Sequence, residues 1–298
     1  MQRKYFANTL LLLALLVFFS ANTVHFIDLQ ESEIYASVSQ KYVFEESKEK
    51  LKGPYLNLKA AVLIDTDSKT IVYGKNADKQ RPIASLTKLV AAMVIIDKGI
   101  DLNSTATISK EDARRSSRSR LPVGAELTLN DLMHAALMNS DNRAMRALAR
   151  VTCGTIEEFT REMNLKVNRL GLTKTIFTEP TGLSPKNLST AIEVAKILHY
   201  VLEYDYITKV TSRKRYKVKI LSKKNSYRQM ANTNLLVLSP YKVIAGKTGY
   251  IQASDYCLAA MVENMDGKCL AAVVLGVPGD KLRFKEMRKL LKWGFKNI

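Results

Sequence analysis

The sequence predicts an α+β fold in which an antiparallel sheet is interrupted by an inserted helical lobe. Two observations support this prediction. Strand-like segments lie near the beginning and again near the end of the 298-residue chain, and a block of segments with helical spacing lies between them. The hydrophobic fraction of 47% and the charged fraction of 25% are ordinary for a globular protein. They indicate neither a disordered chain nor a polytopic membrane protein.

The first segment, residues 1–23, is typical of a secretory signal peptide. Two basic residues precede an apolar run from Leu10 to Phe19, and small or polar residues follow. The run is shorter than the about 20 apolar residues that a membrane span needs. Cleavage after Ala21 would put a bulky phenylalanine three residues before the cut, so cleavage after Thr23 and retention as a short anchor stay open. A buried core helix is a further alternative for the segment. We expect export to the periplasm or to the extracytoplasmic face of the inner membrane.

The remaining chain is expected to form a linker or irregular arm over residues 24–55 and one domain over 56–298, with the helical lobe at about 100–210. Two strands are predicted at residues 58–65 and 70–75, and a helix from Ser85 to about Lys98. Further helices are predicted at 129–138, 142–151, 156–170 and 190–202, the last with Ser189 as N-cap. Strand-like runs follow at 216–221, 242–245, 256–263 and 269–275, and residues 280–295 predict an amphipathic closing helix.

The cysteines are too few for a disulfide framework: Cys153, Cys257 and Cys269. The last two lie on apolar runs joined by a turn at residues 264–267. If Glu263 pairs with Lys268 across that turn, the two sulfurs are several residues out of register. We therefore expect three small core residues and no bridge.

The net charge is +18, and a basic stretch contributes much of it: Arg213, Lys214, Arg215, Lys217, Lys219, Lys223, Lys224 and Arg228. Such a surface suits anionic partners, including membrane headgroups, wall polymers and nucleic acid. The charges alternate with apolar residues, which indicates the solvent face of strands. Export argues against nucleic acid, so we expect attraction to the cell envelope and contact with a membrane surface.

Ser85 and Lys88 form the first motif with chemical potential. A serine hydroxyl needs a base to become a nucleophile, and residues three apart share one face of a helix. A lysine that is partly desolvated beside other cations can lose its proton near neutral pH. The alternative is an N-capping serine with an exposed lysine.

Ser140-Asp141-Asn142 is the second motif and lies between two predicted helices. Functionally, Ser140 would relay a proton to the leaving amine, and Asn142 would hold the substrate backbone or steady Lys88. The alternative is an ordinary helix cap, since all three residue types favour helix starts.

Lys247-Thr248-Gly249 is the third motif, and it ends a predicted strand. Lys247 supplies positive charge, Thr248 offers a hydroxyl to a carboxylate, and Gly249 lets a substrate backbone approach the strand. The alternative is a strand end with an exposed lysine.

The combination is far more specific than its parts. The three motifs occur in order, about 55 and then about 105 residues apart, and resemble those of penicillin-binding proteins and class A β-lactamases. Further stretches resemble the low-molecular-weight serine D-alanyl-D-alanine carboxypeptidases and endopeptidases: residues 81–84, 119–124 and 180–183. Tyr250 after the third motif and residues 232–234 are most similar to the endopeptidase branch (penicillin-binding protein 7). The resemblance covers roughly residues 58–295.

The resemblance implies a β-lactamase/transpeptidase-like fold: a five-stranded antiparallel sheet flanked by N- and C-terminal helices, plus an inserted all-helical lobe. It implies a serine peptidase acting on the D-alanyl-D-alanine stems of peptidoglycan, without metal or cofactor, and trapped covalently by β-lactams. The longer carboxypeptidases of the family carry a further C-terminal β-domain and an anchoring helix, which are not expected here.

The resemblance also implies a role for each site residue. Ser85 is the acylated nucleophile, Lys88 its proton acceptor and Ser140 an assistant in proton transfer. The backbone N–H groups of Ser85 and Tyr250 form the oxyanion hole. The substrate is bound by Asn142, Lys247, Thr248, Gly249, Tyr250 and Arg283.

Two alternatives stay open. Asp141 in the second motif is shared with class A β-lactamases, and Glu179 lies near the place of their deacylating glutamate, although the Leu-Asn that follows it in those enzymes is missing. The second alternative is a non-catalytic wall-binding homologue, which the basic surface would suit.

Overall fold

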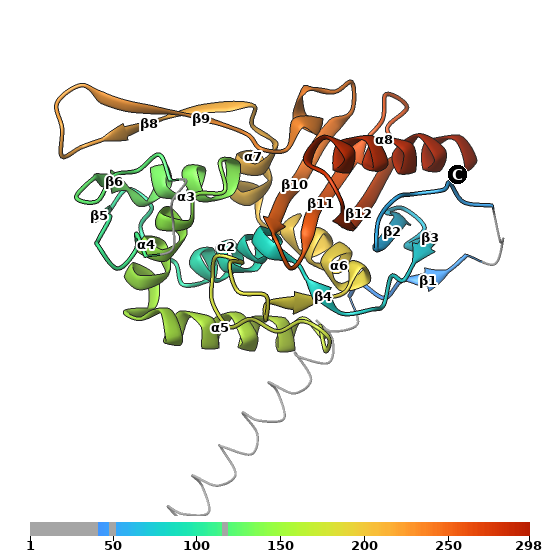
Figure 1. Cartoon of the computed structure of the whole chain (residues 1–298), viewed down its shortest axis with the longest axis horizontal. Helices are drawn as coiled ribbons and strands as arrows, with labels where there is room; N and C mark the ends of the chain where they lie inside the picture. The colour runs from blue at the N-terminus through green and yellow to red at the C-terminus, as the bar shows by residue number, and fades with distance from the viewer. Residues whose placement is uncertain (1–40, 48–51, 115–118) are drawn as a thin grey trace, which may run out of the picture. The chain divides into compact units, whose positions relative to one another are not determined.

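A six-stranded sheet forms the core of the fold in this computed structural model, which describes residues 41–47, 52–114 and 119–298. The strand order is β1-β3-β2-β12-β11-β10, and every neighbouring pair is antiparallel except β1 with β3 (Figure 1). The strands are β1 Glu45–Glu46, β2 Ala60–Asp65, β3 Thr70–Lys75, β10 Lys242–Ile251, β11 Asp255–Glu263 and β12 Cys269–Val277. Strands from early and late in the chain thus meet in one sheet, as predicted.

The sheet has one strand more than the five expected. β1 is two residues long, both exposed, and it pairs in parallel with β3. Two residues are too few to show the alternation of side chains by which a strand is predicted. The additional strand lies on the edge of the sheet opposite β10, so the other five strands keep the expected antiparallel arrangement.

Helices cover both faces of this sheet. Alternate residues of the central strands, such as Leu63, Ala260 and Ala272, share one apolar cluster with Met287 and Leu290 of α8 (Asp280–Asn297). The residues between them are equally buried, and α6 (Ala191–Val201) contacts the same strands. Burial on both faces explains why these strands are continuous apolar runs. The described residues before β2 contain no helix, and the N-terminal flanking helix implied by the resemblance stays a prediction.

The helix α2 (Lys88–Asp97) precedes the inserted lobe at about residues 100–210. The lobe contains α3 Leu129–Met138, α4 Asn142–Cys153 and α5 Ile156–Arg169, with α7 Asp205–Ser212 at its end. The expectation of an all-helical lobe is wrong, because short strand pairs accompany the helices. After the lobe, β8 Arg215–Ile220, close to the strand predicted at 216–221, pairs with β9 Ser226–Ala231. Within the lobe are β5 Thr105–Thr107 with β6 Glu126–Thr128, and β7 Leu188–Ser189, whose partner β4 Arg81–Pro82 precedes the lobe. Strands of two or three residues carry no readable periodicity.

Side chains cap the helices that lead into the site. The Thr128 side chain accepts from Asp131 N at the start of α3, and Asp141 accepts from Arg143 N and Ala144 N at the start of α4. The N-cap of α6 is Thr190 rather than the predicted Ser189. The Thr190 hydroxyl accepts from the backbone N–H of Glu193, three residues later, which is the usual contact of an N-capping threonine. Ser189 belongs to β7 instead.

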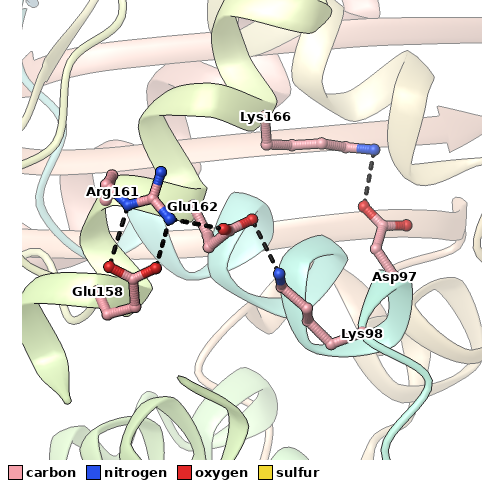
Figure 2. A network of polar contacts seen from close by, with 6 residues as sticks. All are labelled: Asp97, Lys98, Glu158, Arg161, Glu162 and Lys166. Carbon is pink, nitrogen blue, oxygen red and sulfur yellow. Dashed lines mark hydrogen bonds and ion pairs between the residues drawn. The ribbon is translucent and has the colours of Figure 1, made fainter. Parts of the chain in front are cut away.

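Ion pairs connect α5 to the C-terminal end of α2, the helix that begins with Lys88 (Figure 2). Glu162 lies 3.0 Å from Lys98, and Lys166 lies 2.8 Å from Asp97. Arg161 of α5 contacts Glu162 and extends the network along the helix surface. Partly exposed pairs of this kind contribute roughly 0–1 kcal/mol each, so they orient α2 more than they stabilise it.

The turn between β11 and β12 corrects the predicted register. Glu263 pairs with Cys269, one residue further than expected, because the loop holds five residues rather than four. Asn264 Oδ1 accepts from the backbone N–H groups of Asp266 and Lys268, and Gly267 takes φ +81°. All three cysteines are free, as predicted, but only Cys257 is a core residue, because Cys153 and Cys269 are partly exposed.

Residues Tyr42–Asn168 and Leu172–Ile298 form one compact unit. A second unit, Met1–Lys41 with Arg169–Gly171, lies almost wholly outside the described residues, as does the predicted signal or anchor at 1–23. No helix in the described ranges has the length and apolar character needed to cross a membrane.

Candidate active site

Ser85 lies in a single 3₁₀ turn, η1 (Ala84–Thr87), directly before α2. The α-helix itself begins at Lys88, so Ser85 precedes it instead of lying in its first turn as predicted. Ala84 has φ +47°, in the left-handed region that non-glycine residues rarely adopt. The turn therefore stores backbone strain beside the serine hydroxyl, which donates to Thr181 O at 3.2 Å.

Two glycines allow other segments to pack against this turn. A Cβ on Gly182, which has φ +84°, would overlap the carbonyl group of Ala84. A Cβ on Gly249 of β10 would lie 2.9 Å from Ile83 O and 3.1 Å from Ser85 N. The backbone that approaches Gly249 here is that of the serine turn, and the approach of a substrate backbone stays a prediction.

Lys88 is fully buried, and its ammonium group makes three hydrogen bonds. It lies 2.9 Å from Ser85 Oγ, 2.7 Å from Asn142 Oδ1 and 2.6 Å from Thr181 O. Burial lowers the pKa of Lys88 to about 7, although the carboxylates of Glu179 and Asp141 act in the opposite direction. Near neutral pH this amine can therefore exist without its proton, next to the serine hydroxyl.

The second motif forms the loop between α3 and α4. Ser140 has φ +59°, another strained non-glycine conformation. Asp141 caps α4 and also accepts from Ser119 Oγ at 2.6 Å and from Arg120 N. Asn142 begins α4 and contacts Lys88. Asp141 is therefore a structural cap that ties the segment around Ser119 to this loop.

Lys247 lies in the middle of β10 and is also fully buried. Its Nζ donates to Ser140 Oγ at 2.8 Å and to Thr248 O at 2.9 Å. Burial, with the positive groups of Lys88 and Arg283 adding to it, lowers the pKa of Lys247 well below the ordinary lysine value. The strand continues to Ile251, so this motif lies within the strand and does not end it as predicted.

Arg283 of α8 approaches the same strand. It donates to Gly249 O at 3.2 Å and pairs with Asp280 at 2.7 Å. Its guanidinium lies 5.3 Å from the ring centroid of Tyr256, and the Tyr250 ring stacks on Tyr256 at 4.2 Å. The C-terminal helix thus places a cation beside the third motif, and its predicted role in binding the substrate stays a prediction.

These elements enclose a cavity of about 320 Å³. Its lining includes seven of the nine predicted site residues: Ser85, Ser140, Asn142, Thr248, Gly249, Tyr250 and Arg283. The other two, Lys88 and Lys247, are buried behind it and bonded to its wall. The structure therefore brings all nine residues together.

The prediction missed several groups of this site. Thr233 lines the cavity and its hydroxyl lies 2.6 Å from that of Thr248, whereas the sequence of residues 232–234 indicates only a family resemblance. The Thr181 carbonyl contacts both Ser85 and Lys88. A backbone carbonyl acceptor cannot be predicted from the type of its side chain. The neighbouring Gly182 is the residue whose type indicates an unusual backbone conformation here.

Glu179 organises the loop that presents Thr181. Its carboxylate accepts from Thr181 N at 2.8 Å, Gly182 N at 2.6 Å and Asn187 Nδ2 at 3.1 Å, as well as from the Thr181 hydroxyl. Its oxygens are thus occupied within its own loop. No cluster of three or more metal-binding side chains occurs among residues 41–47, 52–114 and 119–298.

Residues 47–279 match the family described as D-alanyl-D-alanine carboxypeptidase. The chain belongs to this family. Among similar members, a D-alanyl-D-alanine endopeptidase of Escherichia coli is 32% identical, over 78% of this chain and 76% of the relative. A D-alanyl-D-alanine carboxypeptidase of Bacillus subtilis is also 32% identical, over 80% of this chain and 62% of the relative.

The family assignment agrees with the solved structures. The DD-transpeptidase of Streptomyces K15 matches with a TM-score of 0.77 and 26% identity, over 83% of this chain and all of that one. The transpeptidase-like α+β fold is thereby confirmed, and membership of the D-alanyl-D-alanine carboxypeptidase family makes the chain a serine hydrolase.

Proposed function

We propose that this chain cleaves D-alanyl peptide bonds in the stem peptides or cross-links of peptidoglycan, through an acyl-enzyme on Ser85. The observation that carries the proposal is the 2.9 Å contact between Ser85 Oγ and a buried lysine amine whose pKa is lowered to about 7. A nucleophile with an adjacent base is what acyl transfer requires. The membership of the family supports the substrate class.

In the acylation step the neutral amine of Lys88 takes the proton of Ser85, and Oγ attacks the carbonyl carbon of the D-alanyl bond. The oxyanion is held by the backbone N–H groups of Ser85 and Tyr250. Donors fixed in advance stabilise such charge without reorganisation. The close approach of Gly249 to Ser85 N supports this geometry, because it brings β10 alongside the serine turn.

Collapse of the intermediate breaks the C–N bond, and Ser140 passes a proton to the leaving amine. Its hydroxyl is bonded to Lys247, which replenishes that proton. The proton that Lys88 took from Ser85 passes to the Ser140–Lys247 pair, which leaves Lys88 neutral again. Water then hydrolyses the ester: Lys88 accepts a proton of the water and returns it to Ser85 Oγ as the ester bond breaks.

The substrate carboxylate is bound by the Thr248 hydroxyl, with Lys247 and Arg283 supplying positive charge. Burial opposes the charged form of Lys247. An arriving carboxylate raises the pKa of Lys247 again, since an opposite charge favours the protonated amine. Asn142 and Gly249 line the part of the cavity where the peptide backbone lies.

The β-lactamase alternative is weaker because the Glu179 carboxylate accepts hydrogen bonds from its own loop. The non-catalytic alternative is disfavoured because the buried lysines remain bonded to Ser85 and Ser140. We expect a long-lived penicilloyl adduct on Ser85, detectable by mass spectrometry of the intact protein. Fast nitrocefin turnover without peptide cleavage would support the β-lactamase instead.

Labelling with a fluorescent penicillin tests the proposal. The unaltered chain should be labelled and Ser85→Ala should not, while Ser68→Ala, which alters an exposed serine in the β2–β3 turn, should label normally. Labelling of Ser85→Ala would refute the assignment. Digestion of monomeric and cross-linked muropeptides, followed by mass spectrometry, then distinguishes carboxypeptidase from endopeptidase activity.

We also propose that residues 1–23 direct the chain out of the cytoplasm, on the basis of their basic start and apolar run. Fractionation of cells should place the protein in the periplasm or on the outer face of the inner membrane. N-terminal sequencing of the recovered protein would show whether the segment is removed, and recovery from the cytoplasm alone would refute the proposal.

A further inference from the structure

The antiparallel pair β8–β9, here called the basic hairpin, carries cations with no acidic counterpart. Residues 206–254 contain no aspartate or glutamate, whereas residues 213–228 contain eight lysines and arginines: Arg213, Lys214, Arg215, Lys217, Lys219, Lys223, Lys224 and Arg228. All eight are exposed. Within the part of the chain that the structure describes, none of the eight forms an ion pair.

Two acidic residues of elements that pack against the hairpin are already engaged. Asp131 of α3 is buried and accepts from the Tyr216 hydroxyl and from the backbone N–H of Lys219. The Glu126 carboxylate accepts from Thr105 Oγ1. Neither carboxylate contacts a cationic side chain of the hairpin, so neither forms an ion pair with the cations of the hairpin.

The hairpin has one buried and one open face. Val218, Ile220 and Met230 are buried, and the hairpin packs against α3 (Figure 1). Arg215, Lys217 and Lys219 alternate with the buried positions and lie on the open face. Alternate residues of a strand recur about every 7 Å, so these three cations form a straight row. Such a row suits a linear polyanion better than a diffuse patch would.

The base of the hairpin is continuous with the cavity. Asn139 and Thr233 both line the cavity. Asn139 Nδ2 donates to Ala231 O, the last residue of β9, and Thr233 N donates to Met138 O at the end of α3. A polymer that inserts one peptide into the cavity therefore has the row of cations running away from the same rim.

We propose that the basic hairpin is a docking surface for peptidoglycan itself, binding carboxylates of the peptide stems that neighbour the one in the cavity. This inference rests on the proposed function and extends it from the cleaved bond to the polymer. The hairpin increases the residence of polymeric wall on the enzyme and has no part in the acyl transfer. The row along one strand, continuous with the cavity, favours this partner over the membrane surface expected from composition.

The test compares three proteins. One carries Arg215→Glu, Lys217→Glu and Lys219→Glu on the hairpin. A matched control carries Lys285→Glu, Arg288→Glu and Lys292→Glu on the exposed side of α8, which changes the net charge equally. The third is the unaltered chain. Each is measured for co-sedimentation with sacculi stripped of phosphodiester-linked polymers, product release from those sacculi, cleavage of a small soluble stem peptide, and acylation by a fluorescent penicillin.

We expect the hairpin variant to bind sacculi about tenfold more weakly at low salt and to release product more slowly, with the difference shrinking as salt screens the charges. Acylation and small-peptide cleavage should stay unchanged, and the α8 variant should bind like the unaltered chain. Amidation of the carboxylates of the sacculi should abolish the difference between the hairpin variant and the unaltered chain.

Two results would overturn the inference. Equal binding of sacculi by the hairpin and α8 variants would show that net charge alone matters. Loss of binding to vesicles of phosphatidylglycerol and phosphatidylethanolamine, with binding to sacculi intact, would make the hairpin a membrane site. Failure of the proposed function would give a different result from failure of this inference. The unaltered chain would then not be acylated by the penicillin, while its binding to sacculi could still be compared with that of the two variants.

Discussion

Lys247 on β10 and Ser140 in the α3–α4 loop are joined by a 2.8 Å hydrogen bond, although 107 residues separate them. The bond connects the sheet to the inserted lobe directly behind the cavity wall. Neither part contains a complete set of reactive groups, since Ser85 and Lys88 precede the lobe and Lys247 follows it. The chemistry of this site therefore depends on both parts being folded together.

The pKa of Lys88 predicts the pH dependence of acylation. Burial lowers this pKa to about 7, so the amine is charged and unable to accept a proton below that pH, and neutral above it. The rate of acylation by a penicillin should rise with pH and level off, with a midpoint near pH 7. Stopped-flow measurement of the labelling rate checks this, and a rate that does not change across the neutral range would contradict it.

Glu179→Gln should move that midpoint to lower pH. The Glu179 carboxylate favours the charged form of Lys88, so its removal lowers the Lys88 pKa further, by about one pH unit. Glu193→Gln is a suitable control, because the buried Glu193 carboxylate likewise accepts from a backbone N–H, in this case that of Lys174. An unchanged midpoint in Glu179→Gln would argue against the electrostatic link.

Gly182→Ala should be much more damaging than Gly124→Ala. Both glycines have positive φ, +84° and +82°, so each alanine incurs a backbone cost of about 1–2 kcal/mol. Nothing lies within 4 Å of a Cβ at Gly124, whereas at Gly182 the Cβ would overlap the serine turn. Urea denaturation should show an additional loss of about 1–3 kcal/mol for Gly182→Ala, together with slower acylation. Equal losses in the two variants would refute the predicted overlap.

Arg283→Gln should weaken the binding of substrates that end in a free carboxylate. We expect KM to rise about tenfold for a peptide ending in D-alanine, with a smaller change for the same peptide ending in an amide, because a charge-assisted hydrogen bond contributes about 1.5–3 kcal/mol. Arg288→Gln, on the exposed side of the same helix, is the control. Equal effects on the two peptides would exclude a carboxylate partner.

Much of the fold could be predicted because its elements have simple patterns. β3 and α3 begin and end where expected, since a turn separates β2 from β3 and α3 has a threonine cap. α7 was missed although Ile207, Val210 and Thr211 follow helical spacing, because β-branched residues obscure a short helix. The β11–β12 register depended on two hydrogen bonds to the Asn264 side chain, which the turn residues alone do not specify.

The candidate site was predicted from side chains whose types and order carry information. The environment of those side chains was not predictable. Lys88 and Lys247 have the sequence appearance of exposed lysines, yet both are fully buried because segments far apart in the chain close over them. The strain at Ala84 is set by the packing of Gly182 and Gly249 around it, so no local pattern could indicate it.

The free thiol of Cys257 offers an internal reporter of motion at the edge of the sheet. It lies opposite Gly249 in the β10–β11 ladder, is fully buried, and burial raises its pKa to about 11. Side chains stand perpendicular to a sheet, and the turn η1 and helix α6 contact β11, so iodoacetamide can reach this sulfur only when segments packed on this strand move away. Its alkylation rate, resolved by peptide mapping from those of the two partly exposed cysteines, therefore measures how often the segments packed on β11, the serine turn among them, move away, and a bound β-lactam should slow that reaction.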